Sequence, residues 1–537
     1  MTAIPATTVP VVILGAGPVG LALANDLGWR GLPYLLVDRA SEALDFPTSE
    51  AIFSRTMEHF RRWGVADAIR NGGFPPDMPR NVYFMTRILG HELLRLDRPS
   101  NREQHELTRD VSPEGPLWCP KRIFDPLLRQ HLGTASCGRF LTGWEMISFE
   151  QDEAGIDLVL QDVTGGERQA VRCQYLAACD GASSGVRKSL GIGMQGNFAE
   201  GHNLGIYFRS AAVRDAMAGR PGVMADIVNP VRGANLSTVD GDTLWRLVVF
   251  VRDADATALD PRQCIRDAIG GDLPVEIIDA RPWAGHTVVA DSWRRDRVFL
   301  VGDAAHLLWP RGGFGMNTGI GDAVDLGWKL AACHEGWGGK DLLDSYEAER
   351  KPVAARNVAE AASNYRSESS LPIPADLEED SAAGAQARAM LGATIREKRA
   401  GEWRSLGIQL GYIYAGSPIC CDDGTSLPAF DPARYDPTTY PGARAPHAWL
   451  RSGQSLLDLY GRGFHLMHDP ASDPGRFLAA AADRSIPLHA TAYETPAIAA
   501  LYERAFVLVR PDGHVAWRSD RPAAEPGAVL DRASGRA

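Results

Sequence analysis

The sequence lacks paired cysteines, metal-binding spacings and an excess of positive charge. Its eight cysteines are scattered, and no C-x-x-C pair or metal-type spacing joins them. We therefore interpret the adjacent Cys420 and Cys421 as two buried or free thiols, and we expect no metal site. Lys and Arg total 56 against 67 Asp and Glu, a formal net charge of −11. A nucleic-acid-binding surface needs clustered positive charge, so a nucleic-acid partner is not expected.

Long apolar segments are also missing. No apolar run approaches the ~20 residues that a helix needs to cross a bilayer, so we expect no membrane contact. The first ten residues lack a basic segment followed by an apolar one, which argues against a secretory signal peptide. Together with the unpaired cysteines, this favours a cytoplasmic location. The chain has 537 residues, 45% of them hydrophobic and 23% charged, which is typical of a soluble protein with two or three domains.

A glycine-rich turn near the start lies between two apolar runs. The pattern predicts a strand at 11–14, a helix from 21 to about 31 and a second strand at 34–37. In this context Gly15 allows a tight turn, Gly17 lets the backbone approach a pyrophosphate, and Gly20 lets helix and strand pack closely. Asp38 stands about where an acid accepts ribose hydroxyls, roughly 20 residues further on. The segment therefore predicts a dinucleotide-binding βαβ unit, with a coincidental glycine-rich turn as the alternative.

Two further strand-like runs end on an acidic residue. The run at 297–301 stops at Gly302 and Asp303, and a glycine-rich loop at 310–319 then leads into a helix with an apolar face. The run at 175–179 ends at Asp180 and Gly181 before another helix. A carboxylate can hold a polyol hydroxyl, while a glycine loop and a helix N-terminus stabilise negative charge on a ring. An ordinary helix cap is the alternative role for Asp303.

With these motifs the sequence resembles the FAD-dependent aromatic hydroxylases, the single-component flavoprotein monooxygenases related to p-hydroxybenzoate and phenol hydroxylases. The segments 55–64 and 119–128 also resemble helices of that family, and the likeness covers nearly the whole chain. The resemblance implies that FAD is bound by Gly15, Gly17, Gly20, Asp38, Arg39, Lys121, Asp180, Arg187, Asp303, Gly312, Gly313, Gly315, Met316 and Asn317. The chain departs from the family in two places: the segment 46–50 has no arginine, and Lys121 stands where many relatives have glutamine.

The resemblance implies an α/β fold with a Rossmann-like FAD-binding domain interleaved with a β-sheet substrate domain. We expect the FAD-binding domain at 1–194, with a substrate-domain insertion near 75–105, and again at 291–400 with a helical linker. The substrate sheet is expected at 195–290, where segments such as 244–251 alternate with period two. Residues 401–537 resemble the thioredoxin-like extension of longer members. Without a C-x-x-C motif, this extension is expected to have a structural or dimer-supporting role, so a homodimer stays open.

The implied function is an NAD(P)H-consuming monooxygenase that hydroxylates a phenolic or other small aromatic substrate with O₂ through a flavin C4a-hydroperoxide. Because only one dinucleotide fingerprint is present, NADPH or NADH is expected to be a transient reductant. Baeyer–Villiger oxidation or epoxidation of a polyketide-type compound is the alternative on the same scaffold. A nicotinamide dehydrogenase and a non-catalytic flavin-binding protein are two further alternatives, and the dehydrogenase leaves the segment 302–317 unexplained.

Catalytic candidates are fewer. Glu50 stands about where phenol hydroxylases place an acid near the substrate hydroxyl, so it is our candidate base, with a surface carboxylate as the alternative. Pro310, in the loop expected against the ring, and His306, just after Asp303, are the other two candidates. His306 could instead pack or bond locally. In the expected substrate sheet we also consider four residues as pocket or core side chains: His202, Tyr207, Trp245 and Arg246.

Overall fold

The computed structural model describes residues 7–42, 46–251 and 259–537. One of its two large sheets is mostly parallel. Its strands run in the order β16 (Arg294–Arg295), β17 (Val298–Leu300), β10 (Arg168–Ala178), β1 (Thr7–Leu14), β2 (Tyr34–Asp38) and β7 (Gly138–Thr142). All neighbours except β16 and β17 pair in parallel, and β8 (Trp144–Gln151) and β9 (Ile156–Asp162) extend the sheet from β10. Val11, Val12 and Ile13 of β1 are fully buried, as expected for a parallel sheet covered on both faces.

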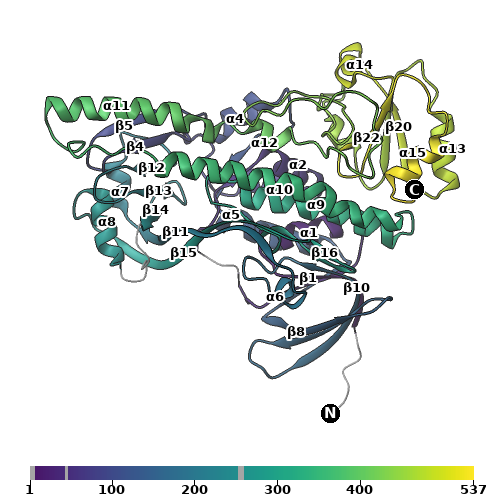
Figure 1. Ribbon diagram of the computed structural model, residues 1–537, viewed down its shortest axis with the longest axis horizontal. Coiled ribbons are helices and arrows are strands. Elements are labelled where there is room, and N and C mark those ends of the chain that lie inside the picture. Colours follow the sequence, from purple (N-terminus) through teal and green to yellow (C-terminus); the bar gives the residue numbers. More distant parts are fainter. Residues whose placement is uncertain (1–6, 43–45, 252–258) are drawn as a thin grey trace.

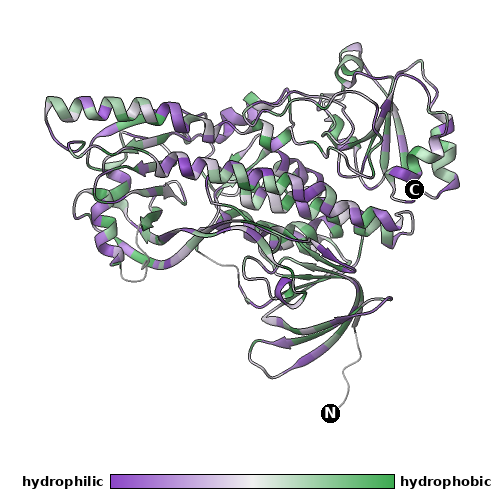
Figure 2. Ribbon diagram, in the orientation of Figure 1, coloured by the Kyte–Doolittle hydropathy of each residue, from purple (hydrophilic) through white to green (hydrophobic). Residues whose placement is uncertain are grey.

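Three helices cover the centre of this sheet. They are α1 (Pro18–Arg30), α9 (Phe314–His334) and the long α10 (Lys340–Ser369), and α9 packs against both of the others. Figure 1 shows α10 crossing the middle of the molecule, with the C-terminal domain in yellow at the upper right. Apolar and polar turns alternate along α10 and along α11 (Ala382–Arg399), which is typical of helices that bury one face (Figure 2).

The second large sheet is mostly antiparallel and draws its strands from distant parts of the chain. Its order is β18 (His306–Leu307), β15 (Glu276–Ala290), β11 (Met194–Arg209), β14 (Leu244–Val251), β13 (Ala234–Thr238), β12 (Met224–Ile227), β4 (Val82–Met85) and β5 (Glu92–Leu96). The alternating run at 244–251 is the strand β14. Strands β4 and β5 fall in the segment near 75–105, and β18 follows the Gly302–Ala304 turn, so this sheet adjoins the parallel one.

The C-terminal domain contains a four-stranded sheet in the order β20 (Leu488–Ala492), β19 (Phe464–His468), β21 (Phe506–Val509) and β22 (Val515–Ser519). The chain forms a parallel βαβ unit with α13 (Gly475–Asp483), passes through α14 (Pro496–Tyr502), and ends in an antiparallel hairpin and α15 (Pro526–Ala533). This arrangement is thioredoxin-like, as the sequence predicts. The predicted hairpin around Pro511, Asp512 and Gly513 is confirmed, because Phe506–Val509 pairs with Val515–Ser519.

Shorter elements connect these layers. They are β3 (Ala51–Ile52), β6 (Leu117–Trp118), α2 (Ser54–Trp63), α3 (Ala66–Arg70), α4 (Asn101–Thr108), α5 (Lys121–His131), α6 (Gly185–Ser189), α7 (Ala211–Ala216), α8 (Pro261–Ile269) and α12 (Leu406–Leu410). Strand β3 pairs with β6 in a small two-stranded sheet. Within the residues that the structure describes, none of the helices is both long and apolar enough to span a bilayer.

Candidate functional site

A cavity of about 520 Å³ runs between the two large sheets. At one end it is lined by Gly17 at the start of α1 and by Gly181 and Asp303 after β10 and β17. The loop at 310–316 and the segment 48–53 line its middle. Residues of the second sheet, among them Met224, close the other end. The cavity therefore joins the predicted dinucleotide site to the predicted substrate sheet.

The glycine loop has the shape that its motif predicts. A Cβ atom on Gly15 would lie 2.4 Å from the Cys179 carbonyl oxygen, and one on Gly20 would lie 1.9 Å from the Gly15 carbonyl oxygen. Gly15 also has a φ of 96°, which favours glycine. A Cβ atom on Gly17 would meet no atom within 4 Å. The chain itself therefore requires glycine at 15 and 20, whereas Gly17 leaves open space beside the N–H groups that begin α1.

The acids at the ends of β2 and β10 face this loop. Asp38 accepts hydrogen bonds from the backbone N–H groups of Ala16 and Ala40, so it already braces the loop. Oδ2 of Asp180 accepts from the Val186 N–H in the first turn of α6 at 3.1 Å, beside the N-cap Ser184. Oδ1 of Asp180 is buried and has no hydrogen-bond partner among the described residues. Asp180, which stands between the cavity-lining residues Cys179 and Gly181, therefore keeps one acceptor without a partner.

Two other residues that the sequence predicts for the dinucleotide end of the cavity do not line it. Arg187 donates to the Ile192 carbonyl at 3.0 Å and does not line the cavity. Arg39 is exposed. Arg129, which sequence reasoning missed, donates to the Ala16 carbonyl at 3.0 Å and so reaches the glycine loop from α5. Nothing in the sequence pattern distinguishes Arg129 from the other basic residues of that helix.

The turn after β17 carries Asp303 into the cavity. Asp303 is exposed to the cavity, whereas His306 is fully buried behind it. The Nε2 atom of His306 lies 2.7 Å from Oδ2 of Asp322 in α9, and its ring stacks on Trp293. The structure therefore does not bring His306 to the cavity, and its observed contacts match the local packing that we gave as the alternative. Asp322 is held in turn by Arg350, whose Nε donates to Oδ1 at 2.8 Å.

The cavity is lined by Pro310, Gly312 and Gly313 of the loop before α9 and by Gly315 and Met316 in the first turn of α9. Gly313 is the N-cap of α9 and has a φ of 73°, so the loop turns sharply into the helix. The helix N-terminus, with its positive dipole end, thus opens onto the cavity. Asn317 has another role. Its amide accepts from the Phe53 N–H and the Thr56 hydroxyl and donates to the Ala51 and Gly313 carbonyls.

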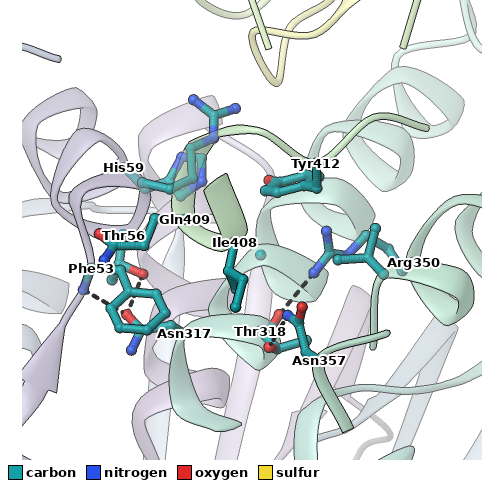
Figure 3. Close-up of a pocket in the computed structure, with 13 residues that line it drawn as sticks. Phe53, Thr56, His59, Asn317, Thr318, Arg350, Asn357, Ile408, Gln409 and Tyr412 are labelled. Carbon is teal, nitrogen blue, oxygen red and sulfur yellow. Dashed lines mark hydrogen bonds between the residues drawn. The ribbon is translucent and has the colours of Figure 1, made fainter. Parts of the chain in front are cut away.

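Those four bonds use the hydrogen-bonding capacity of the Asn317 side chain, which therefore joins α9 to β3 and α2 (Figure 3). Lys121, in contrast, does line the cavity, and its Nζ lies 3.6 Å from Oδ2 of Asp125. Asn317 thus fixes the start of α9 to the segment 51–56, next to the residues that line the cavity.

Glu50 lies in the middle of the cavity wall. It is buried, and Nη1 of Arg246 in β14 lies 2.8 Å from its Oε1. Burial raises the pKa of Glu50 above its ordinary value, and the neighbouring Arg246 opposes that shift. A carboxyl with a raised pKa, close to a cavity, has the properties of a general base. Of the four substrate-sheet residues considered in the sequence, Arg246 lines this cavity, whereas Tyr207 and Trp245 are buried in the sheet.

The far end of the cavity is rich in arginine, which sequence reasoning missed. Arg80 and Arg98 line it beside Trp403 and Gln409. Burial lowers the pKa of Arg98 to about 10 and that of Arg80 to about 9, and Arg98 further lowers the latter. Arg80 donates only to neutral acceptors, and Arg98 donates to the Trp403 carbonyl at 3.5 Å, while the nearby Glu402 opposes the lowering of the Arg98 pKa. These residues come from segments about 300 positions apart, so no local pattern could reveal the cluster.

Comparison with known families decides the nature of this site. A family model described as an FAD binding domain matches residues 8–361, and one described as the C-terminal part of aromatic-ring hydroxylases matches residues 438–537. The chain belongs to the FAD-dependent aromatic hydroxylase family. As a member of this family of FAD-dependent monooxygenases it is an oxidoreductase, and the nicotinamide dehydrogenase alternative is set aside.

Members of the family match over nearly the whole chain. Tetracenomycin B2 monooxygenase-dioxygenase of Streptomyces olivaceus is 34% identical, over 97% of this chain and 97% of that protein. The chromopyrrolic acid-soaked structure of RebC with bound 7-carboxy-K252c is 40% identical with a TM-score of 0.92, covering 99% of this chain and 100% of that one. A ternary complex of aklavinone-11 hydroxylase with FAD and aklavinone is 27% identical with a TM-score of 0.83 and the same coverage.

The residues of this chain fit the cofactor of the hydroxylase family. The open space at Gly17 beside the start of α1 suits a pyrophosphate, and the unpartnered Oδ1 of Asp180 offers an acceptor. Asp303 offers a carboxylate to a polyol chain, and the start of α9 offers its positive end to a ring. Each group lies on the wall of one cavity or directly behind it.

Proposed function

We propose that this enzyme hydroxylates a fused-ring aromatic substrate that carries an acidic group, with NADPH or NADH as a transient reductant and O₂ as oxidant. In the overall reaction one oxygen atom enters the substrate and the other leaves as water, while NAD(P)H is oxidised. The observation that carries the proposal is the single cavity, which joins Gly17 and Asp303 at one end to Arg80 and Arg98 at the other.

The charge at the far end supports an acidic substrate. A buried guanidinium without a countercharge is costly, and the lowered pKa values of Arg80 and Arg98 express that cost. Glu402 also lines this end and partly opposes the fall in the pKa of Arg98, but its carboxylate accepts a hydrogen bond from Arg399 at 2.7 Å and is shared with that guanidinium. A carboxylate or acidic hydroxyl on the substrate would supply the missing negative charge.

The walls support a flat, aromatic substrate. Trp118, Met224 and Trp403 contribute apolar surface to the same end of the cavity. The relatives point the same way, because the RebC structure holds 7-carboxy-K252c after soaking with chromopyrrolic acid, and the aklavinone-11 hydroxylase structure holds aklavinone. The two compounds named for RebC carry carboxyl groups in their names, as the arginine-rich end would require.

Bound FAD would supply the electrons and the activated oxygen, and this chain would supply position and proton handling. Glu50 would take the proton from a substrate hydroxyl, since an electron-rich phenolate reacts more readily. Arg246 would keep Glu50 in place and limit the rise of its pKa. The loop at 310–316 would lie along the ring, with the start of α9 favouring its anionic reduced form.

The test is a substrate panel measured by the rate of anaerobic flavin reduction by NADPH and by NADH. The panel pairs fused-ring aromatic acids with their methyl esters. We expect the acids to bind more tightly and to accelerate reduction more than the esters do. Equal behaviour of acids and esters would contradict the acidic substrate, and a lack of acceleration by every aromatic compound would contradict the reaction. Product mass with ¹⁸O₂ then separates hydroxylation from Baeyer–Villiger oxidation and epoxidation.

A further inference from the structure

The turn between β21 and β22 enters the FAD-binding part of the molecule. Its residues Arg510, Asp512 and His514 are buried. Arg510 donates from Nη1 to Oε1 of Glu349 at 2.5 Å and from Nη2 to Oδ1 of Asp325 at 3.3 Å. Glu349 lies in α10 and Asp325 in α9, the two helices that cross the centre of the molecule. Buried ion pairs thus bind the C-terminal hairpin to both helices.

The hairpin also contacts Arg350, the residue after Glu349, through Tyr414. Arg350 donates from Nη1 to the Tyr414 hydroxyl at 3.3 Å. The Tyr414 ring stacks on His514, with ring centroids 4.3 Å apart, and the Arg510 guanidinium lies 5.2 Å from the Tyr414 centroid. Tyr414 is buried, so these contacts are protected from water. The side chain of Arg350 is therefore in contact with the hairpin through Tyr414.

On its other side Arg350 reaches the wall of the cofactor cavity. It donates from Nε to Oδ1 of Asp322 at 2.8 Å and from Nη2 to the Thr318 carbonyl at 3.0 Å. Asp322 Oδ2 accepts from the Gly302 N–H at 3.3 Å, and Gly302 directly precedes Asp303. Thr318 is in the first turns of α9, just after the glycine-rich loop. One guanidinium thus joins the two elements that face the cofactor.

Arg350 is buried between two tyrosine rings and a small cavity, with its guanidinium 5.5 Å from the Tyr412 ring centroid and 5.9 Å from that of Tyr414. A cavity of about 20 Å³, room for about one water, lies between Arg350, Thr318 and Asn357 on one side and Ile408 and Tyr412 on the other (Figure 3). The guanidinium is therefore held by its hydrogen bonds and by these two rings together. Tyr414, which stacks on His514 of the hairpin, supplies one of the bonds and one of the rings.

We propose that the C-terminal domain supports the cofactor site, with Tyr414 and Arg510 positioning Arg350, and Arg350 positioning the Gly302–Asp303 turn and the start of α9. This role goes beyond the proposed function, because it concerns how the FAD site is held together and not which substrate is hydroxylated. It also gives the thioredoxin-like domain a task that needs no thiol. By linkage, the coupling acts in both directions: a loosened hairpin weakens FAD binding, and bound FAD stabilises the hairpin.

The first test is Tyr414→Phe, which removes the hydroxyl and keeps the ring. The matched control is Tyr460→Phe in the core of the C-terminal domain, whose hydroxyl bonds to that of Tyr502. We expect Tyr414→Phe to raise the FAD dissociation constant of the holoenzyme by roughly tenfold, measured by the fluorescence of released FAD. Tyr460→Phe is expected to leave the FAD dissociation constant unchanged, even if it lowers the melting temperature as much as Tyr414→Phe does.

The second test uses the wild-type chain and needs no variant. Hydrogen exchange is measured with and without saturating FAD. We expect the backbone amides of Arg510 and of 512–514 to exchange more slowly with FAD, while those of α13 do not change. Unchanged exchange at 510–514, or equal FAD dissociation constants for Tyr414→Phe and Tyr460→Phe, would overturn the proposal. Neither readout depends on the substrate, so failure of the proposed hydroxylation leaves this test intact.

Discussion

Nη1 of Arg246 lies 2.8 Å from Oε1 of Glu50, so a buried carboxyl of the cavity wall faces a cation from the centre of the second sheet. The pKa of Glu50 is therefore subject to two opposing influences. Burial raises the pKa of Glu50 and Arg246 lowers it, with burial the larger influence. The carboxyl can thus change protonation state closer to neutral pH than an exposed glutamate does.

The first prediction concerns Glu50 as the base. A base works when deprotonated, so product formation in the wild type should fall as the pH drops through the raised pKa of Glu50. Glu50→Gln should lower the single-turnover rate by roughly 100-fold and remove this acid limb. Flavin reduction in the absence of substrate serves as the control and should not change. An unaltered rate and pH profile of product formation in Glu50→Gln would rule out the base.

The second prediction separates two glycines of the first motif. Gly17→Ala should weaken FAD binding at least tenfold while leaving the stability of the apoprotein unchanged, because the new Cβ meets only open space. Gly20→Ala should destabilise the apoprotein itself, since its Cβ would lie 1.9 Å from the Gly15 carbonyl oxygen. Urea denaturation of both apoproteins, followed by FAD titration, checks the pair. Equal loss of stability in the two variants would contradict these separate roles.

The βαβ unit, the strand at 244–251 and the C-terminal hairpin were predictable because each depends on a local pattern of apolar residues and turns. The same holds for Gly17 and Asp303, which stand at fixed offsets from a strand end. Asn317 and His306 also lie in a motif, but their side chains point into the protein, and a motif does not reveal that direction. The Arg80 and Arg98 cluster could not be predicted, because only the tertiary fold brings it to Trp403.

The third prediction concerns Asn317 as a structural link. Asn317→Ala removes two donors and two acceptors, leaving the Phe53 N–H and the Ala51 carbonyl without this partner. We expect a loss of about 2–4 kcal/mol in the free energy of unfolding. Thr318→Val on the next residue is a comparison that removes only one hydroxyl, and it should cost less. A cost for Asn317→Ala below that of Thr318→Val would contradict the link.

The fourth prediction concerns substrate charge. Arg98→Gln should weaken binding of an aromatic acid about tenfold and leave binding of its methyl ester nearly unchanged, since only the acid uses the guanidinium charge. Arg95→Gln is the matched control, because Arg95 is exposed and paired with Asp97. Flavin absorbance changes on titration report both affinities. Parallel loss of acid and ester binding in Arg98→Gln would show that the side chain shapes the cavity and does not recognise charge.

The fifth prediction concerns the charges beneath the C-terminal hairpin. Arg510 is buried with Glu349, Asp325 and Asp512, so Arg510→Gln removes the cation that pairs with Asp512 and leaves Glu349 and Asp325 with Lys329 alone. Breaking such a buried cluster should cost about 3–5 kcal/mol of unfolding free energy. Arg484→Gln breaks a partly exposed pair with Asp531 in the same domain and should cost much less, because water screens it. Urea denaturation measures the free energy of unfolding of both variants. If Arg510→Gln loses no more of it than Arg484→Gln does, the ion pairs of the hairpin add little to the packing of the C-terminal domain against the rest of the protein.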